Sequence, residues 1–213
     1  NTNESLIQFS VTNMLSPSGY CKTFDEAADG YVRSEGCGIT VLVPLQYAID
    51  NEKFIYSVIL SSNINQDGKS ATLTAPNGPS QEDLYTGCFE RTYIEPKDID
   101  YIECHGTGTP LGDPIETNGI NNVFSKNREK KLLIGSVKSM IGHTEASAGI
   151  AGLIKCCLMM VNKTVPANLH FNLINPKITL SDNIVVAGDI VHKQINYCAI
   201  NSFGFSGTNA HVV

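Results

Sequence analysis

The sequence predicts an α/β fold in which helices cover a layered sheet. Two stretches carry this prediction, residues 99–116 and residues 132–161. In each stretch, a short apolar run typical of a buried strand leads into a glycine-containing loop and then into the start of a helix. Repeated units of this kind build layered sheets in which the strand ends meet at one crevice. We therefore expect the two loops to lie side by side.

The second unit gives the clearer pattern. Residues 132–137 form the apolar run of a buried strand, and the helix that follows has an apolar face. That face comprises Ile150, Leu153, Ile154, Cys157, Leu158 and Val161, at three-and-four spacing. Thr144 is placed to cap this helix, so His143 lies just outside its positive end and a neutral imidazole is favoured. Lys138 leaves the strand nearby, although taken alone this motif is more typical of a capped turn with a solvated lysine.

The first unit places a second histidine in the same way. His105 follows a short strand and opens a loop whose three glycines permit backbone angles that are closed to other residues. Thr107 and Thr109 in this loop offer hydroxyl groups to a polar ligand, or else the loop is a tight structural turn. The segment 113–116, Asp-Pro-Ile-Glu, has a carboxylate at the N-cap, proline at N1 and glutamate at N3, which predicts the start of a helix.

The rest of the chain supplies further strands and helices. The predicted elements are a strand at 30–43, a helix at 45–51, a strand at 56–61, a polar turn at 63–68, a helix capped by Ser80, and two strands joined by a glycine turn at 197–212. Arg33 and Glu35 are expected to form a structural ion pair on one face of the first of these strands. His170, His192 and His211 are expected to be structural, His211 on a buried strand.

Composition limits the class of protein. The chain has 213 residues, 42% of them hydrophobic and 17% charged, as expected for a soluble globular protein. Its net charge of −6 and its pI near 5.3 argue against a nucleic-acid partner. No run is expected to be long enough to span a membrane. Seven irregularly spaced cysteines without a CxxC motif indicate reduced thiols and a cytoplasmic location.

Three loops together resemble a known family. The segments Cys-His-Gly-Thr-Gly-Thr at 104–109, Lys-Ser-Met-Ile-Gly-His at 138–143 and Asn-Ser-Phe-Gly-Phe-Ser-Gly-Thr-Asn-Ala-His at 201–211 resemble the β-ketoacyl synthase domain of type I polyketide synthases. Residues 25–36 are similar to the polyketide branch in particular. The likeness runs nearly from end to end, and several long motifs in the right order make it highly specific.

The resemblance implies a thiolase-like, layered α-β-α-β-α fold that is incomplete here. Residues 1–70 would be the end of the N-terminal half and residues 71–213 the C-terminal half, in a domain that is usually a homodimer. The implied reaction is decarboxylative Claisen condensation of an acyl thioester with a malonyl-type extender. No cofactor would bind the chain directly, because phosphopantetheine is carried by the partner, an acyl carrier protein.

The resemblance also implies roles for individual residues. His105 and His143 would promote decarboxylation and stabilise the enolate. Lys138 would organise the site electrostatically, paired with Glu145. The remaining roles are contacts of Thr107 and Thr109 with the pantetheine arm, an oxyanion-hole N–H and a gating ring from Phe205, and support from Glu145 and Asn209.

One feature of the family is missing from this chain. The family's nucleophile lies in an Ala-Cys-Ser-Ser motif, and thiolate attack is the first chemical step. None of the cysteines here has that context; they are Cys21, Cys37, Cys88, Cys104, Cys156, Cys157 and Cys198. Cys104 is expected to pack in the core, because neighbours on a strand point to opposite faces. The matching segments begin where the family's sequence is already downstream of the nucleophile, so the resemblance implies that the missing cysteine lies before Asn1.

Other functions compete with this interpretation. The chain is alternatively a truncated, inactive remnant that serves at most as an interaction module. A metal site at Cys104, His105 and His143 matches no zinc spacing, so no metal is expected. Nucleotide binding at residues 135–139 is disfavoured because Val137 stands where a phosphate-binding loop requires glycine.

Overall fold

A six-stranded sheet forms the centre of the molecule. The computed structural model describes residues 7, 9–11, 14–70 and 75–213. In the order in which they neighbour one another, the strands are β1 (Ser62–Gln66), β8 (Thr208–Val212), β7 (Cys198–Phe203), β2 (Tyr101–Glu103), β3 (Leu132–Gly135) and β5 (Ile184–Val186). The four strands from β7 to β5 run parallel, whereas β8 is antiparallel to both β7 and β1.

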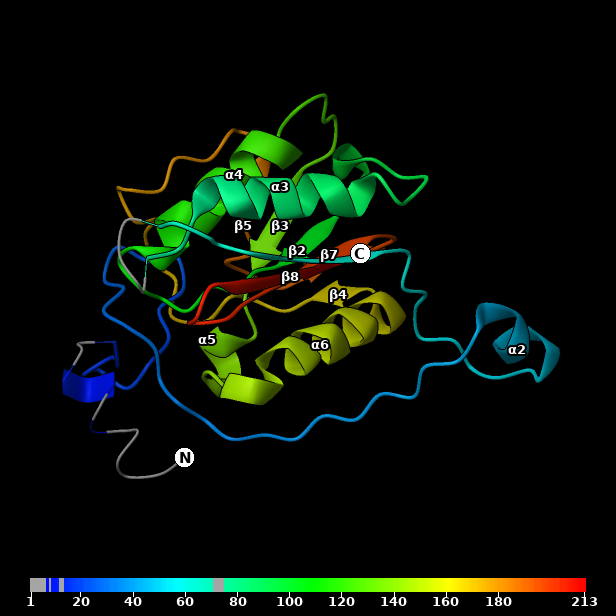
Figure 1. Ribbon diagram of the computed structural model, residues 1–213, viewed down its shortest axis with the longest axis horizontal. Coiled ribbons are helices and arrows are strands. Elements are labelled where there is room, and N and C mark those ends of the chain that lie inside the picture. Colours follow the sequence, from blue (N-terminus) through cyan, green and yellow to red (C-terminus); the bar gives the residue numbers. More distant parts are fainter. Residues whose placement is uncertain (1–6, 8, 12–13, 71–74) are drawn as a thin grey trace.

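Helices cover both faces of the sheet (Figure 1). Helices α3 (Gly78–Phe89) and α4 (Gly112–Phe124) lie on one face, and α6 (Ala148–Asn162) lies on the other. Successive strand residues point to opposite faces, and the two cores follow from this alternation. On β2, Ile102 packs in the cluster that contains Phe124 of α4, and Tyr101 packs in the cluster that contains Met159 of α6.

Short elements complete the chain. They are α2 (Leu45–Asp50), α5 (Lys138–Ile141), the 3-10 turns η1 (Pro96–Asp98) and η2 (Glu145–Ser147), and a two-stranded sheet of β4 (Thr164–Val165) and β6 (Val191–His192). The predicted helix at 45–51, the strand in 132–137, the helix that ends near Val161 and the two final strands are confirmed. His211 lies fully buried on β8, as predicted.

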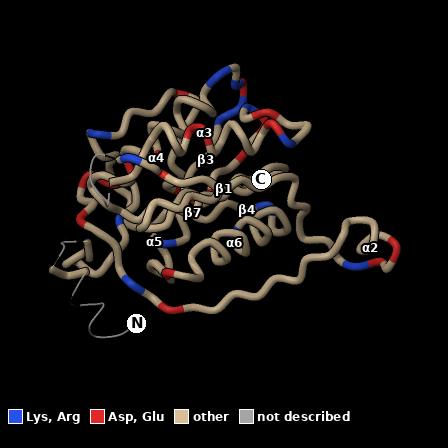
Figure 2. Tube along the Cα trace, viewed as in Figure 1, with Lys and Arg blue, Asp and Glu red and all other residues tan. Residues whose placement is uncertain are grey.

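The predicted strand at 30–43 is wrong. Tyr31 and Arg33 form only isolated bridges, and the chain then runs extended along the side of the molecule that carries α6 (Figure 1). Ile39 and Val41 are 84% and 86% exposed. Figure 2 shows no charged residue between Glu35 and Asp50. The sequence pattern is apolar as a strand requires, but none of the described residues pairs with this segment as a neighbouring strand.

The predicted strand at 56–61 is displaced towards the C-terminus. The observed strand β1 occupies Ser62–Gln66, and four of its five residues fall in the predicted polar turn at 63–68. Its two asparagine side chains bind the neighbouring helix, whereas Ser62 and Gln66 are exposed. The Nδ2 atom of Asn63 donates to the Leu84 carbonyl at 3.1 Å, and that of Asn65 donates to the Ser80 carbonyl at 2.6 Å. Tertiary hydrogen bonds therefore outweigh the low strand propensity of asparagine.

Two predicted helix caps are also wrong. Helix α3 is capped by Asn77, whose side chain accepts the Ser80 N–H at 3.3 Å, so Ser80 lies inside the helix. Thr144 was expected to cap the helix that ends near Val161. The turn η2 intervenes, and α6 begins at Ala148 with Ser147 at its N-cap. The residues that follow Thr144 therefore form a 3-10 turn, and the α-helix starts four residues later.

The segment Glu145–Asn162 is long and apolar enough to cross a membrane, with a mean hydropathy of 1.2 over 18 residues. The prediction that no run reaches that length is therefore wrong by length and composition. One such helix is weak evidence, because the core helix of a soluble protein passes the same test. Here Cys156 and Met159 pack against the sheet, and Lys155 forms a buried ion pair with Glu103.

Two isoleucines on different strands of the sheet test which residues form the core. Ile102 is fully buried on β2, whereas Ile64 on β1 is 73% exposed. We expect Ile102→Ala to lower the free energy of unfolding by about 2–5 kcal/mol, because it leaves a cavity between the sheet and α4. Ile64→Ala should change it by less than about 1 kcal/mol. Denaturant titration of the two variants measures both values, and equal losses would contradict this assignment of the core.

Candidate active site

The sheet brings the two predicted histidines together. β2 and β3 are parallel neighbours, with Glu103 opposite Gly135 in the register. His105 follows the end of β2, and His143 follows α5, the short helix after β3. Their ring centroids lie 5.6 Å apart with an interplanar angle of 82°. The two loops therefore lie side by side, as expected, and each places one histidine next to the other.

Backbone donors fix the tautomer of both rings. The Phe203 N–H donates to Nδ1 of His105 at 3.2 Å, and the Glu145 N–H donates to Nδ1 of His143 at 2.9 Å. A backbone N–H can only donate, so each Nδ1 must be unprotonated. A neutral imidazole carries its proton on the other nitrogen. Each ring therefore presents Nε2–H as a donor.

The surroundings keep both rings neutral. Burial, reinforced by the positive charge of Lys138, lowers the pKa of His143 from its ordinary value of 6.5 to about 3. The same two causes hold the pKa of His105 well below its ordinary value. The sequence predicted a neutral His143 from a helix dipole. Desolvation is the larger cause here, since η2 separates His143 from α6.

Lys138 is a buried charge and not a solvated one. Only 4% of its surface is exposed, and burial lowers the pKa of its ammonium group while nearby Glu103 and Glu116 oppose that shift. Its predicted pairing with Glu145 is wrong, because the Glu145 carboxylate binds Nε of Arg33 at 2.9 Å. The same contact replaces the predicted pair between Arg33 and Glu35.

Two carboxylates hold the loop that carries His105. Oε1 of Glu116 accepts the His105 N–H at 2.7 Å, and its Oε2 accepts the Gly106 N–H at 2.8 Å. Asp113 accepts the Gly108 N–H at 3.1 Å. Both residues were predicted to cap α4, which instead begins at Gly112 with Leu111 at its N-cap. The loop folds back over the start of the helix, and its own backbone N–H groups need acceptors. The two carboxylates accept these N–H groups and do not cap the helix.

The threonines of this loop lie next to each other. Their Oγ1 atoms are 3.2 Å apart, and Oγ1 of Thr109 also accepts the Gly112 N–H at 3.1 Å. Thr107 is 8% exposed, and Thr109 is partly exposed. The loop also needs glycine at position 106, where φ is +44° and a Cβ atom would lie 2.7 Å from the Ser136 Cβ.

Two family models match most of this chain. The model described as "Beta-ketoacyl synthase, C-terminal domain" matches residues 56–172, and the model described as "Beta-ketoacyl synthase, N-terminal domain" matches residues 1–48. This chain belongs to the β-ketoacyl synthase family. The family predicted from the three loops is thereby confirmed, and the first two of those loops lie within the matched residues.

Relatives of this ketosynthase chain are much longer than it is. A phenolphthiocerol/phthiocerol polyketide synthase protein of Mycobacterium tuberculosis is 45% identical over 206 residues, which cover 94% of this chain and 9% of the relative. The probable polyketide synthase 26 of Dictyostelium discoideum is 45% identical over 218 residues, 96% of this chain and 9% of the relative. The chain thus spans about a tenth of the length of these curated relatives.

Solved ketosynthase structures confirm the thiolase-like α/β fold. The ketosynthase from module 6 of the bacillaene synthase of Bacillus subtilis 168 superposes with a TM-score of 0.94 at 42% identity, covering 99% of this chain and 40% of that chain. An oxazolomycin ketosynthase domain from Streptomyces albus gives a TM-score of 0.93 at 32% identity, covering 99% and 39%. The chain matches two fifths of such a domain.

The remaining residues of the ketosynthase motifs take other positions. Phe205 lies in the turn between β7 and β8, 58% exposed, with its ring edge-on to Phe9 at 6.1 Å. The aromatic ring beside His105 is that of Phe203, at 5.5 Å. Asn209 is buried, and its Nδ2 donates to Asp67 at 2.8 Å, which joins β8 to the end of β1.

A polar chain links His211 to this site. Nδ1 of His211 lies 2.7 Å from Oδ1 of Asn201, and Nδ2 of Asn201 donates to Glu116 at 2.8 Å. Glu116 in turn holds the His105 loop. The sequence did not single out Asn201 for this network, nor Glu103, whose carboxylate binds Lys155 and accepts the Val137 N–H next to Lys138. A polar residue inside an otherwise apolar strand was the available signal.

The cysteines near the histidines are poor nucleophiles. Cys21 is 2% exposed, its sulfur accepts the Val32 N–H at 3.2 Å, and burial raises the pKa of its thiol. Cys104 is 1% exposed in the core, as predicted, and burial raises its thiol pKa well above the ordinary value. Neutral thiols react slowly, so neither residue supplies the nucleophile that the family requires.

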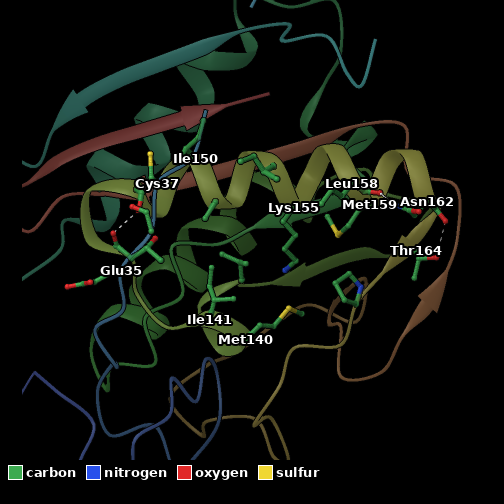
Figure 3. A pocket seen from close by; sticks show the side chains of 18 residues that line it. Glu35, Cys37, Met140, Ile141, Ile150, Lys155, Leu158, Met159, Asn162 and Thr164 are labelled. Carbon is green, nitrogen blue, oxygen red and sulfur yellow. Dashed lines mark hydrogen bonds between the residues drawn. The ribbon is translucent and has the colours of Figure 1, made fainter. Parts of the chain in front are cut away.

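A groove of about 670 Å³ runs along α6, and its lining includes Thr144, the residue after His143 (Figure 3). Residues of α6 such as Leu158 form one wall, Glu35 and Cys37 of the extended segment lie at one end, and Met140 and Ile141 lie opposite α6. Neither histidine lines it. Among the described residues, no group of three or more His, Cys, Asp or Glu is placed to hold a metal ion.

The depressed histidine pKa predicts how stability depends on pH. Between pH 6.5 and about 3 the unfolded chain binds a proton at His143 that the folded chain does not, so stability falls as the pH falls through this window. The slope is at most about 1.4 kcal/mol per pH unit for each such histidine. Unfolding of the parent and of His143→Gln at pH 7, 6, 5 and 4 should show a shallower fall for the variant. Identical slopes would mean that His143 is not held neutral.

Proposed function

We propose that this chain supplies the histidine part of a ketosynthase site that catalyses decarboxylative Claisen condensation. The substrates are an acyl thioester and a malonyl-type extender on an acyl carrier protein. One observation carries the proposal. Two neighbouring imidazoles each have Nδ1 occupied by a backbone N–H, so that two neutral Nε2–H donors remain.

The chemistry needs such donors. Loss of carbon dioxide from a malonyl thioester breaks the C–C bond, and its electron pair moves onto the thioester as an enolate. Fixed hydrogen-bond donors placed where this negative charge develops lower the barrier. His105 and His143 are proposed to donate to the enolate oxygen. The enolate carbon then attacks the acyl thioester of the family's nucleophilic cysteine, forms the new C–C bond and releases the thiolate.

Lys138 is proposed to act through its charge. Its ammonium group is buried near both histidines and favours the neutral form of each. A cationic imidazole would carry a proton on both nitrogens, so its Nδ1 could no longer accept the backbone N–H. The same positive charge also stabilises an enolate at short range, because charges interact strongly in a poorly solvated site.

The partner groups follow from the family. Phosphopantetheine on the carrier protein delivers the thioester. Thr109, which is partly exposed, is proposed to contact the amide groups of the pantetheine arm through its hydroxyl, together with the neighbouring Thr107. The Phe205 N–H is proposed for the oxyanion hole, its ring for gating and Asn209 for support. The homodimer, the division of the chain at residue 70 and a cytoplasmic location are part of the same proposal.

Removal of either imidazole tests the proposal. In the complete ketosynthase that contains this segment, His105→Ala and His143→Ala should each lower the condensation rate by about 100-fold or more, because one donor to the developing charge is lost. Self-acylation of the nucleophile should stay largely intact. Carrier-protein acylation and condensation assays separate the two steps.

The matched control is His192→Ala. His192 lies exposed on β6, so its removal should leave both steps unchanged. Loss of acylation in both active-site variants would contradict the roles proposed. A full-length transcript that encodes an upstream Ala-Cys-Ser-Ser motif in frame would reject the alternative, a truncated and inactive remnant, whereas a start codon close to Asn1 would support it.

A further inference from the structure

Glu145 has an unusual backbone conformation next to His143. Its φ is +53°, in the left-handed region that residues other than glycine rarely adopt. The N–H of the peptide between Thr144 and Glu145 donates to Nδ1 of His143 at 2.9 Å. Because the turn η2 anchors the chain on the other side of Glu145, a change of φ there would have to rotate this peptide plane and its N–H. A strained residue at a candidate site persists only where its surroundings hold it. The contact that fixes the tautomer of His143 therefore needs a second contact that holds Glu145.

Arg33 supplies that second contact. Its Nε lies 2.9 Å from Oε1 of Glu145, and only 9% of the Arg33 side chain is exposed. The guanidinium also lies over the Phe9 ring, 5.0 Å from its centroid. A planar guanidinium that stacks on a ring and binds a carboxylate has little freedom to follow a moving partner. The ion pair with Arg33 thus restrains the side chain of Glu145.

The same segment holds the backbone of His143. The His143 N–H donates to the Val32 carbonyl at 2.7 Å, and the Ser34 N–H donates to the His143 carbonyl at 2.9 Å. Arg33 stands between these two residues and pairs with His143 in a parallel bridge. The side chain of Arg33 and the backbone around it therefore act on one histidine from two directions.

We propose that Arg33 is a positioning residue for His143, acting through the carboxylate and the amide of Glu145. By holding Glu145 at positive φ, it keeps an N–H on Nδ1 and so keeps the proton of His143 on Nε2, where the condensation needs a donor. The inference rests on the proposed function and deepens it. Without Arg33, Glu145 relaxes to negative φ, its N–H leaves Nδ1, and the Nδ1–H tautomer becomes accessible.

The test uses the complete ketosynthase with Arg33→Met, Glu145→Gly and the double variant. Nitrogen-15 NMR reports which nitrogen of His143 carries the proton. Arg33→Met should populate the Nδ1–H form and lower the condensation rate by about 10- to 100-fold, with self-acylation unchanged. Glycine adopts positive φ without strain, so Glu145→Gly keeps the N–H in place. Arg33→Met should then add less than about 2-fold to its effect.

Lys22→Met is the matched control. It removes another ion pair of the N-terminal segment, between Lys22 and Asp29 at 2.8 Å, and should move neither the tautomer nor the condensation rate. Arg33→Lys and Glu145→Gln replace any variant that fails to fold, since both keep side-chain bulk. An unchanged tautomer in folded Arg33 variants overturns the proposal, as does an equal loss of rate with and without Glu145→Gly. The tautomer readout needs no condensation, so it separates this failure from failure of the proposed function.

Discussion

The parallel pairing of β2 with β3 is the constraint on which the site depends. It sets Tyr101 opposite Leu133 and Glu103 opposite Gly135, so the chain leaves both strands at the same edge of the sheet. The next few residues of each strand then have to share one small region. His105 lies two residues beyond β2, whereas His143 lies eight residues beyond β3, and the short helix α5 brings it back to the same place. A slip of one residue in the strand register would turn the strand side chains to the other face.

Buried charge is the second feature that organises this edge. Five ionisable side chains there are buried, namely Glu103, Asp113, Glu116, Lys138 and Lys155. Removing such groups from water costs several kcal/mol each, so each needs partners with good geometry. Glu103 has three, since it binds Lys155 and the Tyr101 hydroxyl at 2.8 Å each and also accepts the Val137 N–H. These bonds fix the turn that leads to Lys138. The charge of Lys138 therefore has a fixed position beside the histidines.

The two imidazoles illustrate how an ordinary fold prepares chemistry. Neither ring is held by a side-chain acid; each Nδ1 is met by a backbone N–H, from the end of β7 and from Glu145. A backbone donor selects a tautomer without adding a proton acceptor to the site. Desolvation and Lys138 then keep the rings neutral. Such donors need no reorganisation when negative charge develops beside them, which is the property that the proposed condensation requires.

The sequence by itself determined the two strand–loop–helix units, the positions of His105 and His143 in their loops, and the family. These features lie in local periodicity and in motifs whose residues are near one another in the chain. It misplaced the strand at 30–43, because an apolar pattern does not state whether a partner strand lies beside it. Tertiary structure alone decided that Glu116 and Asp113 hold a loop and do not cap a helix, and that Arg33 binds Glu145. That last contact joins residues 112 positions apart, and no local pattern encodes a pairing over such a distance.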